Sequence, residues 1–112
     1  MATIVVGCTD LIFRAKVGET VKRAGGEASF GRTADDLVKL GGADGVSLVL
    51  LDLTVPAFRG IAGRLKEAGA QRVVGFFRHE EIDVRDEALS AGCDEVVTRN
   101  EFAKRLPKII GA

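Results

Sequence analysis

Four consecutive apolar residues, Leu48-Val49-Leu50-Leu51, place the strongest constraint on the fold of this chain. Turn-forming residues flank this short segment on both sides. A strand that is apolar without alternation is covered on both faces, which is typical of a central strand in a parallel sheet. Neighbouring parallel strands need long crossover connections, usually helices. The segment therefore predicts an α/β protein with a buried parallel sheet.

The rest of the chain alternates short strand-like segments with segments of helical periodicity. Further strands are predicted at 4–6, 28–30, 73–77 and 95–98. The helices between them are predicted from residues at spacings of three and four. The residues that indicate them are Phe13, Val17, Val21 and Ala24; Leu37, Val38 and Leu40; Ile61, Ala62, Leu65 and Ala68; Ile82, Arg85, Ala88 and Leu89; and Phe102, Leu106 and Ile109. Asp10, Thr33 and Asn100 are the predicted N-caps.

Five β-α units with short connections predict one doubly wound domain over residues 1–112. Its three layers are helices on both faces of a five-stranded parallel sheet, and the expected strand order is the flavodoxin-like 2-1-3-4-5. The chain is rich in glycine, with 14 residues in 112. Most of these glycines fall where a predicted helix ends, so no phosphate-binding loop is needed to explain them.

Composition excludes several classes of partner. The 16 Lys and Arg residues balance the 16 Asp and Glu residues, so no net field attracts nucleic acid or an anionic membrane. No apolar run approaches the roughly 18 residues of a membrane span. The start of the chain shows no signal peptide, and two cysteines are too few for a disulfide framework. We expect a cytoplasmic protein, and no disulfide between Cys8 and Cys93 because they fall at opposite edges of the sheet.

In doubly wound folds the functional residues lie where the strands end at their carboxyl termini. This rule selects 7–10, 52–56, 77–80 and 98–100. Two stretches that contain or precede these positions resemble the receiver domain of bacterial response regulators. The first is Leu48-Val49-Leu50-Leu51-Asp52-Leu53-Thr54-Val55-Pro56 with Gly60, and the second is Ala88-Leu89-Ser90-Ala91-Gly92-Cys93-Asp94-Glu95-Val96-Val97-Thr98. The resemblance covers essentially the whole chain.

The resemblance implies phosphoryl transfer from a histidine kinase to Asp52, assisted by a divalent cation. The cation neutralises the anionic phosphoryl oxygens and the carboxylate together. The family holds it with an acidic pair, and the matching residues here are Gly7 and Cys8. Neither is the oxygen ligand that Mg²⁺ prefers. Asp10 is two residues further on and is the remaining candidate ligand, although it is also expected to cap a helix.

Other positions that the resemblance implies to be functional have also changed. Phe77 stands where the family has a hydroxyl that contacts the phosphoryl group, and Val96 stands where it has a switching aromatic. Arg99 replaces the phosphate-binding lysine, and the two cations are not equivalent at a packed site. Asn100 replaces the following proline. We expect the Phe77 ring to fill the space that the switching aromatic would enter.

These changes predict a pseudo-receiver, a non-enzymatic signalling domain that binds protein partners without phosphorylation or a metal cofactor. Asp52 is then a solvated strand-end residue paired with Arg99. The expected partner is a protein or an effector domain, with a histidine kinase and a second copy of the chain as candidates. The contact face implied by the resemblance runs over the last two helices and the strand between them, and the candidate surface residues are Arg78, His79, Val96 and Asn100.

Two alternatives remain open at the level of sequence. In the first, Asp52 is phosphorylated through a non-standard site for Mg²⁺. In the second, Cys8 and Arg14 form the C-x₅-R pattern of thiol phosphatases, in which a thiolate attacks phosphate held by backbone amides and the arginine. Against this reading, the five residues between Cys8 and Arg14 include no glycine to shape a phosphate loop, and Asp10 would repel the anion.

Overall fold

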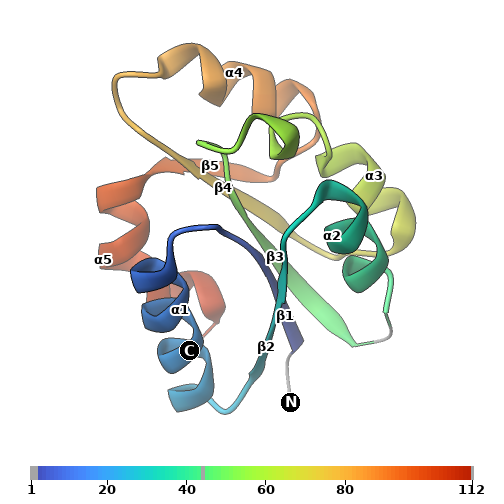
Figure 1. Cartoon of the computed structure of the whole chain (residues 1–112), viewed down its shortest axis with the longest axis vertical. Coiled ribbons are helices and arrows are strands. Elements are labelled where there is room, and N and C mark those ends of the chain that lie inside the picture. Colours follow the sequence, from blue (N-terminus) through green and yellow to red (C-terminus); the bar gives the residue numbers. More distant parts are fainter. Residues whose placement is uncertain (1–2, 44, 112) are drawn as a thin grey trace.

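The computed structural model, which describes residues 3–43 and 45–111, has five strands that alternate with five α-helices and one short 3₁₀ helix (Figure 1). The sheet is parallel throughout, and its order is β2-β1-β3-β4-β5. The elements in chain order are β1 (Thr3–Gly7), α1 (Leu11–Arg23), β2 (Glu27–Gly31), α2 (Ala34–Gly41), β3 (Val46–Asp52), η1 (Pro56–Phe58), α3 (Ala62–Ala68), β4 (Val73–Phe77), α4 (Ile82–Ser90), β5 (Glu95–Thr98) and α5 (Arg99–Ile110). The predicted fold class and strand order are confirmed.

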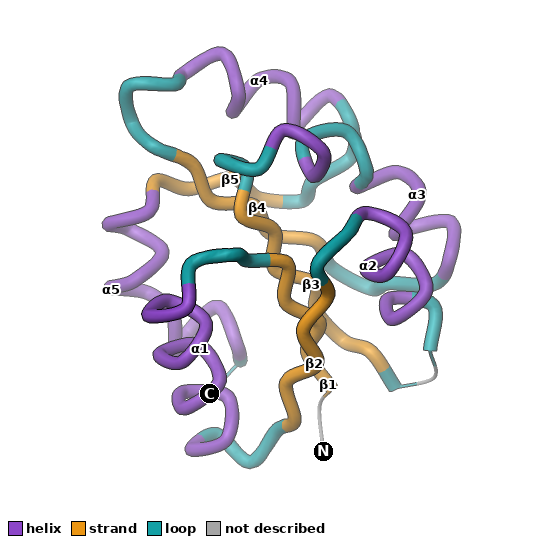
Figure 2. The backbone as a smooth tube through the Cα atoms, viewed as in Figure 1, coloured by secondary structure: helices purple, strands orange, loops and turns teal. Residues whose placement is uncertain are grey.

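Helices cover both faces of the sheet and divide the core into two halves. Helices α1 and α5 lie together on one face, and α2, α3 and α4 lie on the other (Figure 2). The apolar run in β3 supplies both halves, because Leu48 and Leu50 point toward α1 and α5 while Val49 and Leu51 point the other way. All four side chains are buried. This is the double coverage that the unbroken apolar segment predicts.

The strands end at one edge of the sheet, which we call the carboxyl edge. Gly7 of β1 is in register with Leu51 of β3, and Asp52 is in register with Phe76 of β4. Phe77 is in register with Thr98, the last residue of β5. The ends of β1, β3, β4 and β5 are thereby placed side by side, as the topology requires.

Two of the three predicted N-caps are confirmed, and one is wrong. The Asp10 carboxylate caps α1, and the Thr33 hydroxyl accepts a hydrogen bond from the Asp36 N–H at the start of α2. Helix α5 begins earlier than predicted, because Thr98 caps it by accepting from the Glu101 N–H. Asn100 therefore lies inside the first turn of the helix, with its side chain exposed.

The buried face of α4 is also different from the predicted one. Val84 and Ala88 are its buried residues, whereas Ile82 is 54% exposed and Leu89 is 38% exposed. Arg85 lies on the exposed side as well. The prediction rested on apolar residues at helical spacing, but this helix carries apolar residues on two faces. At the end of α1, Ala24 is likewise an exposed C-cap rather than part of the buried face.

No helix in the described residues has the length and apolar character needed to cross a membrane.

Candidate functional site

The Asp52 carboxylate is buried at the carboxyl edge, and residues of this chain donate hydrogen bonds to both of its oxygens. Its exposed fraction is 1%, and it is the only charged side chain classed as buried in the described part of the chain. Oδ1 accepts hydrogen bonds from the backbone N–H of Thr54 at 3.0 Å and from its hydroxyl at 2.6 Å. Oδ2 accepts from the thiol of Cys8 at 3.6 Å. The prediction of a solvated Asp52 paired with Arg99 is wrong.

The turn that follows β3 holds Asp52 in this position. Asp52 and Thr54 form a local side-chain turn, in which a carboxylate accepts from the backbone two residues ahead. Leu53 lies between them and packs so closely on Gly75 of β4 that a Cβ at Gly75 would come within 2.7 Å of Leu53 Cδ1. Arg59 donates from Nε to the carbonyl of Leu53 at 2.7 Å. The turn is therefore braced by a neighbouring strand and by a side chain of the next loop.

Gly7 has no room for an acidic side chain. A Cβ at this position would lie 2.5 Å from Leu37 Cδ1 and 3.3 Å from a ring carbon of Phe58. Leu37 and Phe58 are both buried, so neither can move into solvent to make space. The position that matches the first member of the family's acidic pair is consequently filled by apolar side chains from α2 and η1.

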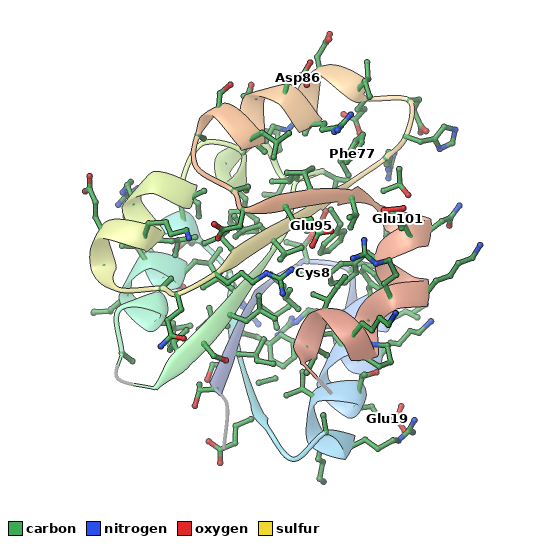
Figure 3. All side chains as sticks on the ribbon, turned by 180° about the vertical axis from the view of Figure 1, so that it is seen from behind. Cys8, Glu19, Phe77, Asp86, Glu95 and Glu101 are labelled. Carbon is green, nitrogen blue, oxygen red and sulfur yellow. The ribbon has the colours of Figure 1, made fainter. Side chains whose placement is uncertain are left out.

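Cys8 is a neutral hydrogen-bond donor rather than an anionic ligand. The pKa of the Cys8 thiol is raised to about 11, because burial raises it most, the nearby Asp52 carboxylate also raises it, and a hydrogen bond with the backbone of Asp10 lowers it only in part. The thiol stays protonated at neutral pH, and its S–H has two acceptors in reach, Asp52 Oδ2 at 3.6 Å and the backbone carbonyl of Asp10 at 3.9 Å. Figure 3 shows Cys8 in the interior of the molecule, where the strands end.

Asp10 and Arg99 form a second group of paired side chains, distinct from the contacts of Asp52 with Thr54 and Cys8. Asp10 Oδ1 accepts from the backbone N–H groups of Ile12 and Phe13, and Oδ2 accepts from Arg99 Nη2 at 2.5 Å. These contacts, the Phe13 N–H first and then the guanidinium, lower the pKa of Asp10. The Arg99 guanidinium also lies 4.7 Å from the centre of the Phe13 ring. Arg99 therefore neutralises Asp10 and not Asp52.

These residues do not fit a Mg²⁺ ion, which prefers several oxygen ligands in an octahedral arrangement. Asp52 has chain donors on both oxygens, and so does Asp10. Gly7 cannot carry a ligand, and the Cys8 thiol is a soft donor that is protonated. Across residues 3–43 and 45–111, no group of three His, Cys, Asp or Glu side chains is placed to hold a metal ion.

Phe77 and Val96 pack together beneath α4. Both belong to one apolar cluster with Val84 and Ala88, and their exposed fractions are 3% and 9%. Figure 3 places Phe77 under α4, whose outer surface is marked by Asp86. The predicted inward position of the Phe77 ring is confirmed. Val96, in contrast, is buried, so its expected role as a partner-surface residue is wrong.

The other three predicted surface residues gather at one hollow. Arg78, His79 and Asn100 are exposed, and together with Glu80, Thr98 and Arg99 they line a depression of about 320 Å³ at the carboxyl edge. His79 lies in the turn before α4 and contacts the Glu80 carboxylate at 3.2 Å. The hollow is formed by the β4–α4 connection and the start of α5, which are neighbours only because β4 and β5 pair.

The two residues of the phosphatase pattern, Cys8 and Arg14, lie close together in the structure, but their contacts do not support attack of the thiol on phosphate. Cys8 and Arg14 line one hollow of about 330 Å³ with Arg32. Arg14, however, stacks over the Phe30 ring at 4.9 Å, and the Cys8 thiol is protonated and directed at a carboxylate. A phosphate anion approaching this thiol would meet the buried charge of Asp52, so the arrangement opposes nucleophilic attack.

We expect Cys8 to be unreactive toward iodoacetamide in the folded protein. With a pKa of about 11, the thiolate fraction at pH 8 is on the order of a thousandth. The measurement is alkylation of a Cys93→Ser variant, in which Cys8 is the only thiol, with the urea-unfolded chain as the positive control. Rapid stoichiometric labelling of the folded variant near neutral pH would contradict the assignment of Cys8 as a protonated thiol and would support the phosphatase hypothesis.

Comparisons with known proteins support the fold. No protein-family model and no curated protein matches the chain. Among solved structures, it is similar to a response regulator from Burkholderia pseudomallei with a phosphorylated aspartic acid and a calcium ion, at TM-score 0.83 and 15% identity, over 100% of this chain and 68% of that one. A receiver domain from Clostridium thermocellum matches at TM-score 0.82 and 16% identity, over 98% of this chain and 91% of that one.

A third similar structure is the receiver domain of the Saccharomyces cerevisiae response regulator Ssk1, crystallised with the histidine phosphotransfer protein Ypd1. It matches at TM-score 0.73 and 15% identity, over 88% of this chain and 78% of that one. At these identities the likeness concerns the fold, and the chain has the fold of response-regulator receiver domains.

Proposed function

We propose that this chain is a pseudo-receiver, which takes part in two-component-type signalling by binding a protein partner and does so without phosphorylation of Asp52. The receiver fold and the resemblance at Asp52, Pro56 and Gly60 support the signalling context. The binding partner is a protein or an effector domain, and the domain catalyses no reaction.

One observation supports the proposal: both oxygens of the buried Asp52 carboxylate accept hydrogen bonds from other residues of this chain. A buried carboxylate is costly unless donors satisfy it. Two hydrogen bonds from Thr54 and one from Cys8 supply those donors. A phosphoryl group entering at Asp52 would compete with these donors, and Arg99, which stands where the family has its phosphate-binding lysine, is engaged by Asp10.

The proposed contact face includes the hollow lined by Arg78, His79 and Asn100 and the exposed side of α4. Ile82 and Leu89 add apolar area to that face, and they lie at the two ends of the helix. Apolar residues in a polar surrounding are typical of protein interaction sites. The complex of Ssk1 with Ypd1 is an example of a receiver domain that binds another signalling protein.

The experiment that tests the proposal replaces Asp52 by asparagine. We expect a host strain that carries only Asp52→Asn to behave as the wild type does, whereas a deletion strain loses the response. The amide oxygen can still accept both hydrogen bonds from Thr54, so the free energy of unfolding should change by less than about 1 kcal/mol. The matched control is Asp86→Asn, which makes the same change at an exposed position of α4.

The proposal is contradicted if Asp52→Asn reproduces the deletion phenotype while the variant is folded and present at the wild-type level, because signalling then requires the carboxylate. Acetyl phosphate treatment followed by intact-protein mass spectrometry would then establish whether Asp52 is phosphorylated through a non-standard Mg²⁺ site.

A further inference from the structure

Two arginine side chains come together where β1 and β2 end. Gly7 of β1 is in register with Gly31 of β2, so the residues that follow these strands are neighbours at the carboxyl edge. Arg32 comes directly after β2, and Arg14 belongs to the first turn of α1. Both line a single hollow of about 330 Å³, whose other lining residues are Cys8, Thr9 and Leu11. The pairing of β1 with β2 therefore places two guanidinium groups at one hollow.

The lining of this hollow carries positive charge and no carboxylate. Four other hollows of the described chain each combine cations with at least one acidic residue, and those acidic residues are Glu27, Glu80, Glu19 and Glu101. Neither Arg14 nor Arg32 forms an ion pair anywhere in residues 3–43 and 45–111. Like charges in one hollow repel each other, and an anion between them turns the repulsion into two attractions. The charge of this lining thus selects an anion.

Contacts within the chain prepare the hollow for an anion. The Arg14 guanidinium stacks on the Phe30 ring at 4.9 Å, which reduces the side-chain freedom that binding would otherwise have to remove. The Thr9 hydroxyl is exposed in the same lining and can donate a hydrogen bond. The neighbouring Asp10 carboxylate would repel an anion, but it is engaged by the start of α1 and by Arg99. The donors are therefore in place, and the nearest exposed carboxylate is neutralised.

An apolar surface adjoins the two arginines. A second hollow, of about 360 Å³, shares Leu11 and Arg14 with the first, and its other lining residues are Ala15, Gly18, Glu19 and Phe30. Leu11 is 74% exposed although it is a large apolar side chain. A ligand whose anionic group lies between the arginines can cover Leu11 with an apolar part, which removes apolar surface from water. The two hollows together fit a molecule with one anionic end and one apolar end.

We propose that these two hollows bind a small phosphomonoester, with its phosphoryl group between Arg14 and Arg32 and its organic part over Leu11. A phosphomonoester carries close to two negative charges at neutral pH, which match the two guanidinium groups, whereas a carboxylate carries one. Each guanidinium can donate two parallel hydrogen bonds to phosphoryl oxygens. Singly charged anions, including chloride and beryllofluoride, match only half of this charge and bind more weakly.

Binding at this site is reversible and breaks no bond. The Cys8 thiol is buried and protonated, so it does not attack the phosphoryl group. The site goes beyond the proposed signalling function, and it does not require the Asp52 carboxylate. It gives the chain a way to respond to a small phosphorylated molecule without a metal ion.

The test is NMR of the whole chain, titrated with phenyl phosphate at constant ionic strength and at about pH 7.5, where a phosphomonoester is doubly charged. Saturable shifts should appear at the backbone amides and the guanidinium N–H signals of Arg14 and Arg32. Benzoate has the same ring and one charge, and it should bind about tenfold more weakly or worse. Inorganic phosphate lacks the ring and should also bind more weakly than phenyl phosphate.

Two variants examine the arginines separately. Arg32→Gln should weaken phenyl phosphate binding by about tenfold or more, because one of two charge-assisted contacts is lost. Arg32 is exposed, so this variant should fold as the wild type does. Arg14→Lys should also weaken binding, because lysine keeps the charge but lacks the paired donors of the guanidinium. Circular dichroism checks that each variant is folded.

The matched control is Arg72→Gln, which removes an exposed arginine just before β4, at the opposite edge of the sheet. We expect it to bind phenyl phosphate as the wild type does. The proposal is overturned if phenyl phosphate gives no saturable shifts at Arg14 and Arg32, if benzoate binds as tightly, or if Arg32→Gln binds as the wild type does. None of these results changes the outcome expected for Asp52→Asn, so failures of the two proposals can be told apart.

Discussion

Replacing Phe77 by threonine is expected to lower the free energy of unfolding by about 2–4 kcal/mol, the range for truncation of a buried aromatic side chain. The Phe77 ring is buried beneath α4, in the same cluster as Val84, Ala88 and Val96. Val96 is too small to fill the vacated volume. The threonine hydroxyl would also be buried, which adds a desolvation cost unless it finds a partner. Urea unfolding measured by circular dichroism gives the difference.

The control for Phe77→Thr is Phe77→Leu, which keeps an apolar side chain and should lose clearly less stability. We also expect that Phe77→Thr creates no phosphorylation-dependent change in amide spectra, although it introduces the hydroxyl that receiver domains carry at this position, because Gly7 and Cys8 are unchanged. A loss below about 0.5 kcal/mol, typical of surface positions, would contradict the packing described for the ring.

Replacing Cys8 by aspartate is expected to destabilise the protein by about 3 kcal/mol at neutral pH, the magnitude for a buried charge without a partner. Cys8 Sγ lies 3.6 Å from Asp52 Oδ2, so the new carboxylate would stand beside an existing one. Two adjacent carboxylates share a proton, which raises the pKa of one of them above its value in the unfolded chain. The proton is then bound more tightly in the native state. The stability that Cys8→Asp loses relative to Cys8→Asn is therefore smallest in acid and grows as pH rises from about 4 toward the raised pKa.

The matched control for Cys8→Asp is Cys8→Asn, which has the same shape and no charge. Millimolar Mg²⁺ should restore part of the stability of Cys8→Asp, because a ligand that binds only the native state stabilises it, and should leave Cys8→Asn and the wild type unchanged. Equal stability of the aspartate and asparagine variants at all pH values would contradict the close contact between position 8 and Asp52.

Local sequence patterns predicted the architecture well, and physical reasons explain why. The apolar run of β3 has one stable environment, the middle of a covered parallel sheet, and the structure buries all of it. Asp10 and Thr33 cap helices through contacts with residues two or three positions away. These features depend on residues that are close together in the sequence, so they can be detected from the sequence alone.

The site depended on contacts between distant residues, and there the predictions failed. Arg99 was expected at Asp52, but it contacts Asp10, which is 89 residues away in the sequence. Leu37 and Phe58 fill the space beside Gly7, and nothing in the local sequence indicates this. Thr54 was also missed, although an Asp followed two residues later by Thr is a turn pattern that sequence analysis can detect. At α4, apolar residues on two faces made the local signal ambiguous. At α5, the cap is Thr98, two residues before the predicted Asn100.

The most direct test of the account is amide NMR of the wild-type chain titrated with Mg²⁺ and then with beryllofluoride, a phosphoryl mimic. Thr54 and Cys8 already donate hydrogen bonds to the Asp52 carboxylate. The Asp10 carboxylate is likewise engaged, by the helix N–H groups that it caps and by Arg99. We therefore predict no saturable shifts at the amides of 8–10 and 52–54 at millimolar Mg²⁺, with or without beryllofluoride. Saturable shifts at these amides that grow when beryllofluoride is added would contradict the pseudo-receiver and identify a working phosphorylation site.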